Sequence, residues 1–215
     1  MSRHPGWIAI VAGLAILAYI SLNTLRTEGP GSRGIPAGRS LPPFAAPLVL
    51  SDLEGDANVA TRRNHGNAAG ARPACDVRDP RALNVCALVR RRPVVLAFLT
   101  PGAEHCVAEL DAIERVAPRF PRVAFAAVAV SGDRDDLRKL VREHGWSFPV
   151  AQDRDGAVAN LYGVAVCPTV VFAHPGGRVM RTALAGQVAT PAALTRAVRA
   201  LLVRPRAHIA AGAAR

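Results

Sequence analysis

The residues in this chain best suited to chemistry are its four cysteines, Cys75, Cys86, Cys106 and Cys167. A cysteine thiolate is a nucleophile and a metal ligand, and two cysteines can pass electrons by forming a disulfide. An even number fits disulfides in an oxidising compartment, and four cysteines allow three complete pairings. No Cys-x-x-Cys pair or suitably spaced histidine accompanies them, so we predict no metal site. We also expect no cofactor.

Cys106 closes the sequence "AEHC", residues 103–106, which follows the apolar run "PVVLAFL" at 93–99. The short apolar run is typical of a central strand, whereas the periodicity of 103–117 predicts a helix with Cys106 in its first turn. The dipole of such a helix favours a thiolate there. The competing interpretation is that Cys106 is a small buried residue with an inert thiol.

The elements that must position Cys106 follow in a regular order. We predict strands over 122–130, 169–173 and 178–184, and helices over 133–145, 156–162 and 190–203. Strands joined by helices require parallel pairing, whereas "HPGG" between the last two strands indicates an antiparallel hairpin. The expected fold class is therefore α/β, a mixed central sheet with helices on both faces.

The N-terminal part has a different composition. After a short tail (1–6), residues 7–25 are apolar and uncharged, and a helix of this length spans about 28 Å, close to a bilayer core. We interpret 7–25 as a transmembrane signal-anchor, with a cleaved signal peptide as the alternative. Residues 26–47 are rich in Gly, Pro, Ser and Arg, which predicts a flexible linker.

The remaining boundaries follow from this organisation. Residues 48–203 form the predicted domain, in which 61–86 is an insertion with two cysteines, and 204–215 form a disordered basic tail. The net charge is +11, but all the basic residues except Lys139 are arginines. Because no nucleic-acid motif accompanies the charge, we expect no nucleic-acid partner and one membrane contact, through 7–25.

Three stretches carry a family resemblance: "LPPFAAPLVLSDLEGDANV", "RRRPVVLAFLTPGAEHCVAELDAIE" and "DRDGAVANLYGVAVCPTVVF". They resemble the membrane-anchored TlpA/ResA-like thiol–disulfide oxidoreductases of the AhpC/TSA–redoxin superfamily. The resemblance implies a thioredoxin-like fold and includes the Cys-x-x-Glu formed by Cys106 and Glu109. It also implies that Pro168 is a cis-proline packed against the active-site turn.

The departures from the family pattern matter for function. Ala103 stands where the resemblance places the first, attacking cysteine, and Asp111 replaces the usual proline of the first helix. The residue before the cis-proline faces the redox centre in the family, and here it is Cys167. We therefore expect Cys106 and Cys167 to lie close together, either as an alternative redox pair or as two small neighbours that are never oxidised.

The neighbours of this pair have simpler expected roles. His105 resembles the histidine that stabilises the attacking thiolate in Cys-x-His-Cys centres, and Glu104 is expected to be a solvated helix-end acid. Glu109 is expected either near the site or at the surface. Cys75 and Cys86 bracket a short turn, so we predict a structural disulfide between them.

The resulting prediction is a membrane-anchored, extracytoplasmic thioredoxin-like protein with thiol–disulfide redox activity through Cys106 and Cys167. Its partners would be protein thiols or disulfides bound in the cis-proline groove. One alternative is a non-catalytic thioredoxin-fold module that binds a partner. The other is a peroxiredoxin-like thiol peroxidase using Cys106, against which Pro168 argues because peroxiredoxins place an arginine near that position.

Overall fold

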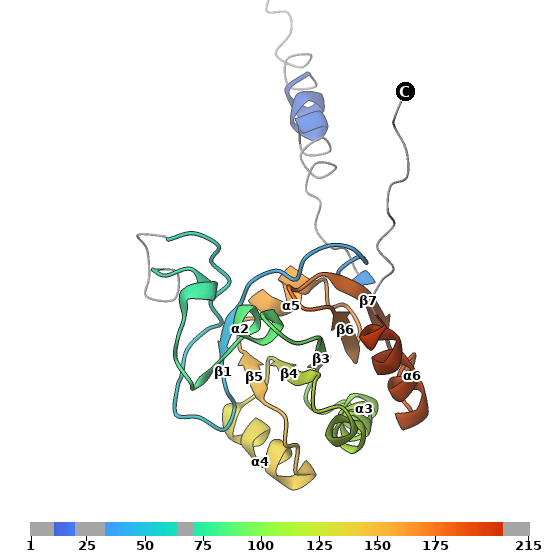
Figure 1. Ribbon diagram of the computed structural model, residues 1–215. Coiled ribbons are helices and arrows are strands. Elements are labelled where there is room, and N and C mark those ends of the chain that lie inside the picture. The colour runs from blue at the N-terminus through green and yellow to red at the C-terminus, as the bar shows by residue number, and fades with distance from the viewer. Residues whose placement is uncertain (1–10, 20–32, 64–70, 204–215) are drawn as a thin grey trace, which may run out of the picture.

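The computed structural model describes residues 11–19, 33–63 and 71–203. The domain that carries the cysteines is built around a five-stranded sheet in the order β5-β4-β3-β6-β7 (Figure 1). Its strands are β3 (Val94–Leu99), β4 (Ala124–Val130), β5 (Val150–Asp153), β6 (Thr169–Ala173) and β7 (Val179–Leu184). β3, β4 and β5 are parallel, whereas β6 and β7 run antiparallel to their neighbours. The prediction of a mixed α/β sheet is confirmed.

Helices cover both faces of this sheet, as predicted (Figure 1). One face packs against α3 (Glu104–Val116), α4 (Arg134–His144) and α6 (Pro191–Leu202). The other packs against α2 (Val85–Val89) and α5 (Ala157–Tyr162). Because alternate residues of β3 and β4 point into the two cores, both strands are apolar throughout, as expected for strands covered on both sides.

The ends of the helices follow the capping residues in the sequence. The Asp133 side chain accepts hydrogen bonds from the first-turn amides of α4, and Gly145, with φ of 62°, ends that helix. Thr190 caps α6 in the same way, ahead of Pro191. The predicted helix bounds were therefore accurate within one or two residues, because the capping side chains make contacts local in sequence.

β5 is an element that the sequence analysis missed. It has four residues, and two of them, Gln152 and Asp153, are polar yet buried. Asp153 accepts hydrogen bonds from the amides of Val158 (3.0 Å) and Ala159 (2.7 Å), so its carboxylate holds the start of α5. A short edge strand with buried polar residues has no apolar pattern by which it could be predicted.

The predicted linker at 26–47 requires a correction. Residues 26–32 lie outside the described residues, but Ile35 and Phe44 are buried in the domain core. The segment between them is hydrogen-bonded to β7 and its preceding turn, for example from the Gly38 amide to the Val179 carbonyl (2.8 Å). The domain therefore begins before residue 48. The Gly and Pro content that indicated a flexible tether instead forms turns against the sheet edge.

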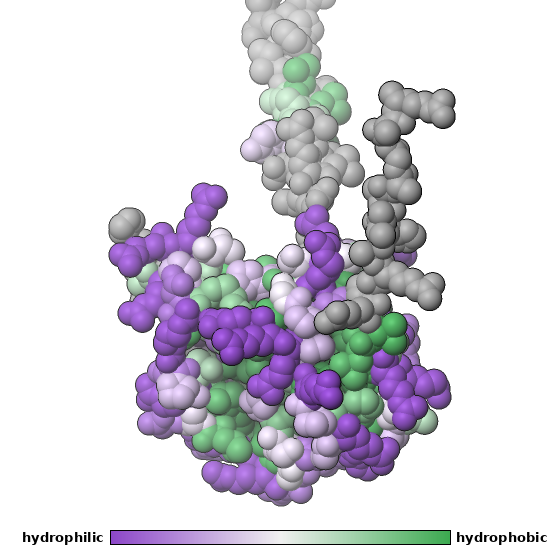
Figure 2. Space-filling view, in the orientation of Figure 1, coloured by the Kyte–Doolittle hydropathy of each residue, from purple (hydrophilic) through white to green (hydrophobic). Residues whose placement is uncertain are grey.

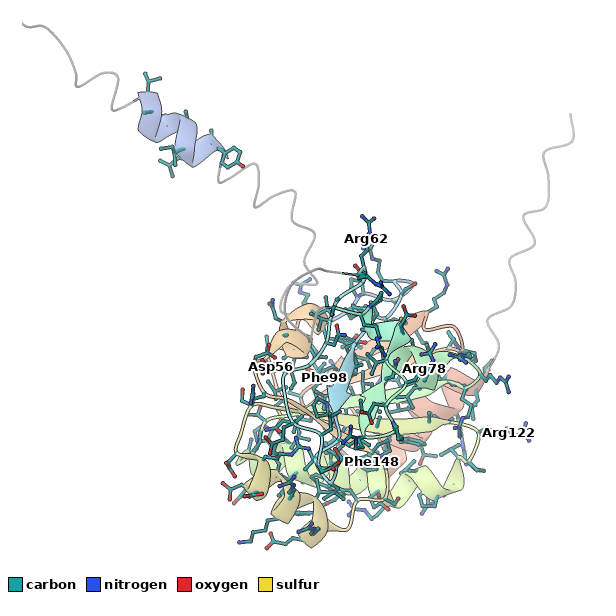
Figure 3. All side chains as sticks on the ribbon, turned by 90° about the vertical axis from the view of Figure 1, so that its left-hand side faces the viewer. Asp56, Arg62, Arg78, Phe98, Arg122 and Phe148 are labelled. Atoms are coloured by element: carbon teal, nitrogen blue, oxygen red, sulfur yellow. A yellow bond between two sulfur atoms is a disulfide. The ribbon has the colours of Figure 1, made fainter. Side chains whose placement is uncertain are left out.

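The insertion folds against a small second sheet. β1 (Ala45–Pro47) pairs with β2 (Ala82–Asn84), and the 3-10 turn η2 (Ala74–Asp76) precedes β2. Cys75 in η2 and Cys86 in α2 form a disulfide with 5.4 Å between their Cα atoms. Strongly hydrophilic side chains gather over this side of the domain, at the upper left of Figure 2. Arg62 projects outward at the top of Figure 3.

A buried amide holds the same two segments together as the disulfide. The Asn84 side chain donates to the carbonyls of Ala74 (2.8 Å) and Val77 (2.9 Å). Its oxygen accepts from the amides of Cys86 (2.9 Å) and Ala87 (3.3 Å). One side chain thus binds the turn that carries Cys75 and the helix that carries Cys86.

We therefore predict that the domain folds without this disulfide. Cys75→Ser/Cys86→Ser should lower the free energy of unfolding by roughly 3 kcal/mol, the loop-closure value for a separation of 11 residues. Urea titration followed by circular dichroism measures this. Asn84→Ala with the disulfide intact is the matched comparison and should cost about 2 to 4 kcal/mol, because four backbone groups lose their partner. An unfolded double serine variant would show that Asn84 cannot hold the turn alone.

The N-terminal region is described only over 11–19, which form a helix with exposed apolar side chains. Among the described residues, no helix has both the length and the apolar character needed to cross a bilayer. Most of the predicted 7–25 span, the tail at 1–6 and the tail at 204–215 lie outside the described residues. These three predictions stay predictions.

Candidate thiol–disulfide site

Cys106 is positioned by the turn between β3 and α3. β3 ends at Leu99 in the centre of the sheet, and Gly102, with φ of 81°, turns the chain into the helix. The Ala103 carbonyl accepts the Cys106 amide at 2.9 Å, so Cys106 lies in the first turn of α3, as predicted. Its side chain is buried and belongs to the core under the sheet.

Cys167 is positioned by the loop between α5 and β6. The Cys167–Pro168 peptide bond is cis, as the family resemblance implies. The Thr169 hydroxyl donates to the Val166 carbonyl at 2.7 Å, which closes the loop around these residues. The helix before this loop, α5, is fixed by the hydroxyl of Tyr162, which donates to the Pro42 carbonyl at 2.8 Å.

The antiparallel pairing of β3 with β6 brings the two cysteines together. Phe98 lies opposite Thr169 in this ladder, so the turn after β3 and the loop before β6 meet at one edge of the sheet. There the Sγ atoms of Cys106 and Cys167 form a disulfide at 2.06 Å, with 5.7 Å between the Cα atoms. That Cα separation lies in the normal range for a disulfide.

The other residues singled out from the sequence surround this bond. His105 is exposed, and its Nε2 atom lies 3.0 Å from the Cys167 carbonyl oxygen. Because a carbonyl oxygen only accepts, Nε2 carries the hydrogen and donates it. Ala103 and Cys167 are half-buried, and Pro168 is buried. Glu104 is exposed at the start of α3, where the helix dipole favours a carboxylate.

One contact at the site was not foreseen from the sequence. The Thr100 amide donates to the Cys167 sulfur at 3.1 Å. Thr100 is the first residue after β3, so its amide falls outside the strand's ladder. A backbone donor has no side-chain signature, and only the expected register between β3 and β6 could have indicated it.

Glu109 lies one helical turn after Cys106 on the buried face of α3, and its side chain is only 2% exposed. Of the two placements expected for Glu109, the structure therefore supports the buried one near the site. Burial raises the pKa of Glu109 to about 7, and the Gly186 backbone acts weakly in the opposite direction. Its Oε2 atom has no hydrogen-bond partner in the described structure.

The raised pKa of Glu109 makes stability depend on pH. Between pH 4.5 and about pH 7, Glu109 holds a proton in the folded state but has lost it in the unfolded state. The contribution of Glu109 to the free energy of unfolding is therefore greatest below pH 4.5 and is lost as the pH rises through 7. Relative to Glu109→Gln, we expect wild type to lose roughly 3 kcal/mol between pH 4.5 and pH 8. Urea unfolding of both proteins at several pH values measures this, and parallel curves would contradict it.

Asp111 has a structural reason to replace the usual proline. Its carboxylate accepts the indole N–H of Trp146 at 2.8 Å and lies 2.9 Å from Nδ1 of His144. Asp111 thereby ties α3 to the end of α4 and the segment leading to β5. This contact therefore fixes α3, the helix that begins next to the cysteines. No sequence motif indicated it.

Two further observations limit the chemistry that the site can perform. In the part of the chain that the structure describes, no group of three or more His, Cys, Asp or Glu residues could hold a metal ion. A cavity of about 1300 Å³ opens on the side of the insertion, and the residues that line it include Asp56, Arg78 and Arg154. Asp56 and Arg78 are labelled in Figure 3. Neither Cys106 nor Cys167 lines the cavity, so this cavity and the cysteine pair are separate features.

A helix with a cysteine in its first turn opposite a cis-proline, on a sheet of order β5-β4-β3-β6-β7, decides the fold. This is a thioredoxin fold. Residues 80–182 match the AhpC/TSA family. The thioredoxin-like domain is also similar to a crystal structure of a secreted Mycobacterium tuberculosis disulfide oxidoreductase homologous to Escherichia coli DsbE. The two share 27% identity with a TM-score of 0.51, over 55% of this chain and 88% of that one.

Curated relatives support the same resemblance. The soluble secreted antigen MPT53 of Mycobacterium tuberculosis is 31% identical over 91 residues, which is 42% of this chain and 53% of that protein. The thiol-disulfide oxidoreductase ResA of Oceanobacillus iheyensis is 30% identical over 88 residues, which is 40% of this chain and 46% of that protein. The chain spans about half the length of the curated relatives it matches. The predicted resemblance to thioredoxin-fold redoxins is confirmed.

Proposed function

We propose that this protein catalyses thiol–disulfide exchange through a reversible disulfide between Cys106 and Cys167. The observation that carries the proposal is the bond between these sulfurs, from the first turn of α3 to the cis-proline loop. In the thioredoxin-like enzymes that the chain resembles, the partner of Cys106 would stand at Ala103. Here Cys167 supplies the second sulfur, so a two-electron couple is retained without a Cys-x-x-Cys sequence.

The surroundings of the pair suit this chemistry. The first turn of α3 favours negative charge on a sulfur, and the pair lies at the ends of the inner strands β3 and β6, where Cys167 and His105 reach solvent. Glu109, with its pKa near 7, can gain or lose a proton at neutral pH one helical turn from Cys106. The similarity to a ResA thiol-disulfide oxidoreductase supports the same class of reaction.

The partner we propose is a protein thiol or disulfide bound in the groove beside the cis-proline. Val166, next to Cys167, is an apolar side chain with 41% of its surface exposed. It offers a substrate chain an apolar contact within one residue of the reacting sulfur. His105 and Glu104 add exposed polar groups at the start of α3.

Turnover of insulin disulfides by dithiothreitol tests the proposal. We expect wild type to accelerate the reaction and both Cys106→Ser and Cys167→Ser to reduce it to the uncatalysed rate, because each removes one half of the couple. Cys75→Ser/Cys86→Ser is the matched control and should retain the wild-type rate, since that disulfide lies in the insertion.

Two outcomes, read from the insulin assay and from a peroxide-consumption assay on the same proteins, would contradict the proposal. Peroxide consumption that is lost in Cys106→Ser but kept in Cys167→Ser would identify a thiol peroxidase instead. A folded wild type without insulin or peroxide turnover would leave the partner-binding module. Circular dichroism of each variant establishes that the fold is intact.

We further propose that residues 7–25 anchor the chain in a membrane with the thioredoxin domain on the extracytoplasmic side. The apolar run and the exposed apolar side chains of the helix at 11–19, such as Leu14 and Leu17, support an anchor. Two disulfides in one domain support an oxidising compartment.

Membrane fractionation of cells that express the full chain tests this location. The protein should stay in the pellet after carbonate extraction, and Leu14→Asp/Leu17→Asp should release it, because each charge costs roughly 3 kcal/mol in a bilayer. Protease added to intact spheroplasts should digest the domain while a cytoplasmic marker survives. A protected domain would contradict the orientation, and a wild type released by carbonate would contradict the anchor.

A further inference from the structure

The two sulfurs of the Cys106–Cys167 pair lie in different environments. Cys106 has no exposed surface and packs in the core beneath the sheet, whereas Cys167 lies half-buried at the edge of that core. A thiol or disulfide that arrives from solvent must reach the sulfur with which it exchanges. Only the Cys167 side of the pair is open to such an approach.

We infer that Cys167 is the attacking thiol of this protein and that Cys106 is the resolving thiol. This inference rests on the proposed exchange activity. It reverses the direction that the resemblance implies, in which the attacking sulfur stands on the helix at the position of Ala103. Because Ala103 carries no sulfur, the solvent-facing role passes across the groove to the cis-proline loop.

A backbone donor supports this assignment. The Thr100 amide hydrogen bond, 3.1 Å long, ends on the sulfur of Cys167. A hydrogen bond donated to sulfur stabilises the thiolate relative to the thiol, so it favours both the attack by Cys167 and its departure from a mixed disulfide.

The backbone of Cys167 is held independently of the disulfide. His105 Nε2 donates to the Cys167 carbonyl at 3.0 Å, and the Thr169 hydroxyl donates to the Val166 carbonyl at 2.7 Å. These contacts do not involve either sulfur. When the disulfide opens, they keep Cys167 facing the groove, so His105 is a positioning residue for the attacking thiol.

The exchange reduces the substrate disulfide and oxidises the protein in two steps. The Cys167 thiolate attacks one sulfur of a substrate disulfide, the substrate S–S bond breaks, and the released substrate thiolate takes up a proton. This leaves a mixed disulfide between Cys167 and the substrate. Cys106 loses its proton and attacks the Cys167 sulfur, which forms the intramolecular disulfide and expels the second substrate thiolate. The substrate gains two electrons and the protein loses two.

Competitive alkylation distinguishes the two cysteines. The full chain, reduced with dithiothreitol and freed of it, is pulsed with iodoacetamide at pH 7, quenched and digested with trypsin. Arg115 and Arg154 separate the two cysteines into different peptides, so mass spectrometry follows each one. We expect Cys167 to be alkylated at least about tenfold faster than Cys106, because reaction requires an accessible thiolate. The same pulse in urea is the control and should label both at similar rates.

Trapping with oxidised glutathione gives a second, independent measurement. Cys106→Ser, which keeps the attacking thiol but has no resolving thiol, should accumulate a glutathione adduct on Cys167. Cys167→Ser should accumulate little adduct on Cys106. Faster alkylation of Cys106, equal rates, or an adduct mainly on Cys106 would each overturn the inference.

His105 is tested by substitutions that remove or keep its donor. His105→Ala should slow adduct formation on Cys167 in the Cys106→Ser protein by about three- to tenfold, the value of one hydrogen bond. His105→Gln, which keeps an N–H donor, should recover part of the rate, whereas a purely structural role predicts no such rescue. Insulin turnover tests the proposed function separately. If the wild type turns over insulin but the serine variants form the glutathione adduct mainly on Cys106, only the direction of attack is contradicted.

Discussion

The antiparallel pairing of β3 with β6 is the constraint on which the site depends. It sets Phe98 opposite Thr169, and this register brings the turn before α3 to the loop that carries the cis-proline. A shift by one residue would turn every side chain of β6 to the other face and move Cys167 away from Cys106. Both strands are buried on both faces, so two apolar cores hold the register. The chemistry of the pair is therefore built on a packing interaction.

The parts of the fold that could be predicted were those specified by local sequence. Asp133, Gly145 and Thr190 mark helix ends through contacts with their own neighbours, and the apolar run of β3 is unambiguous. β5 and the segment from Ile35 to Phe44 were missed for the opposite reason. They mix a few apolar residues with polar or turn-forming ones, and only contacts distant in sequence place them against the sheet.

The residues of the candidate site also divide into those that the sequence indicates and those that depend on distant contacts. Cys106, Cys167, Pro168 and His105 could be singled out because side-chain type and family resemblance indicate them. The Thr100 amide, the burial of Glu109 and the anchoring contact of Asp111 depend on tertiary structure. Each is a polar group whose role is set by what surrounds it, and one sequence does not specify those surroundings. The sequence thus located the pair but did not show how its two sulfurs differ.

The span of the Cys106–Cys167 bridge has a consequence of its own. A Cys-x-x-Cys disulfide closes a loop within one helical turn, so opening it changes the freedom of the unfolded chain little. This bridge joins residues 61 apart and links the start of α3 to the loop before β6. By loop entropy alone, closing it favours the folded domain by roughly 4 kcal/mol. Because this effect acts on the unfolded chain, reducing the bridge lowers the free energy of unfolding, and the oxidation state of the pair is thereby linked to the stability of the fold.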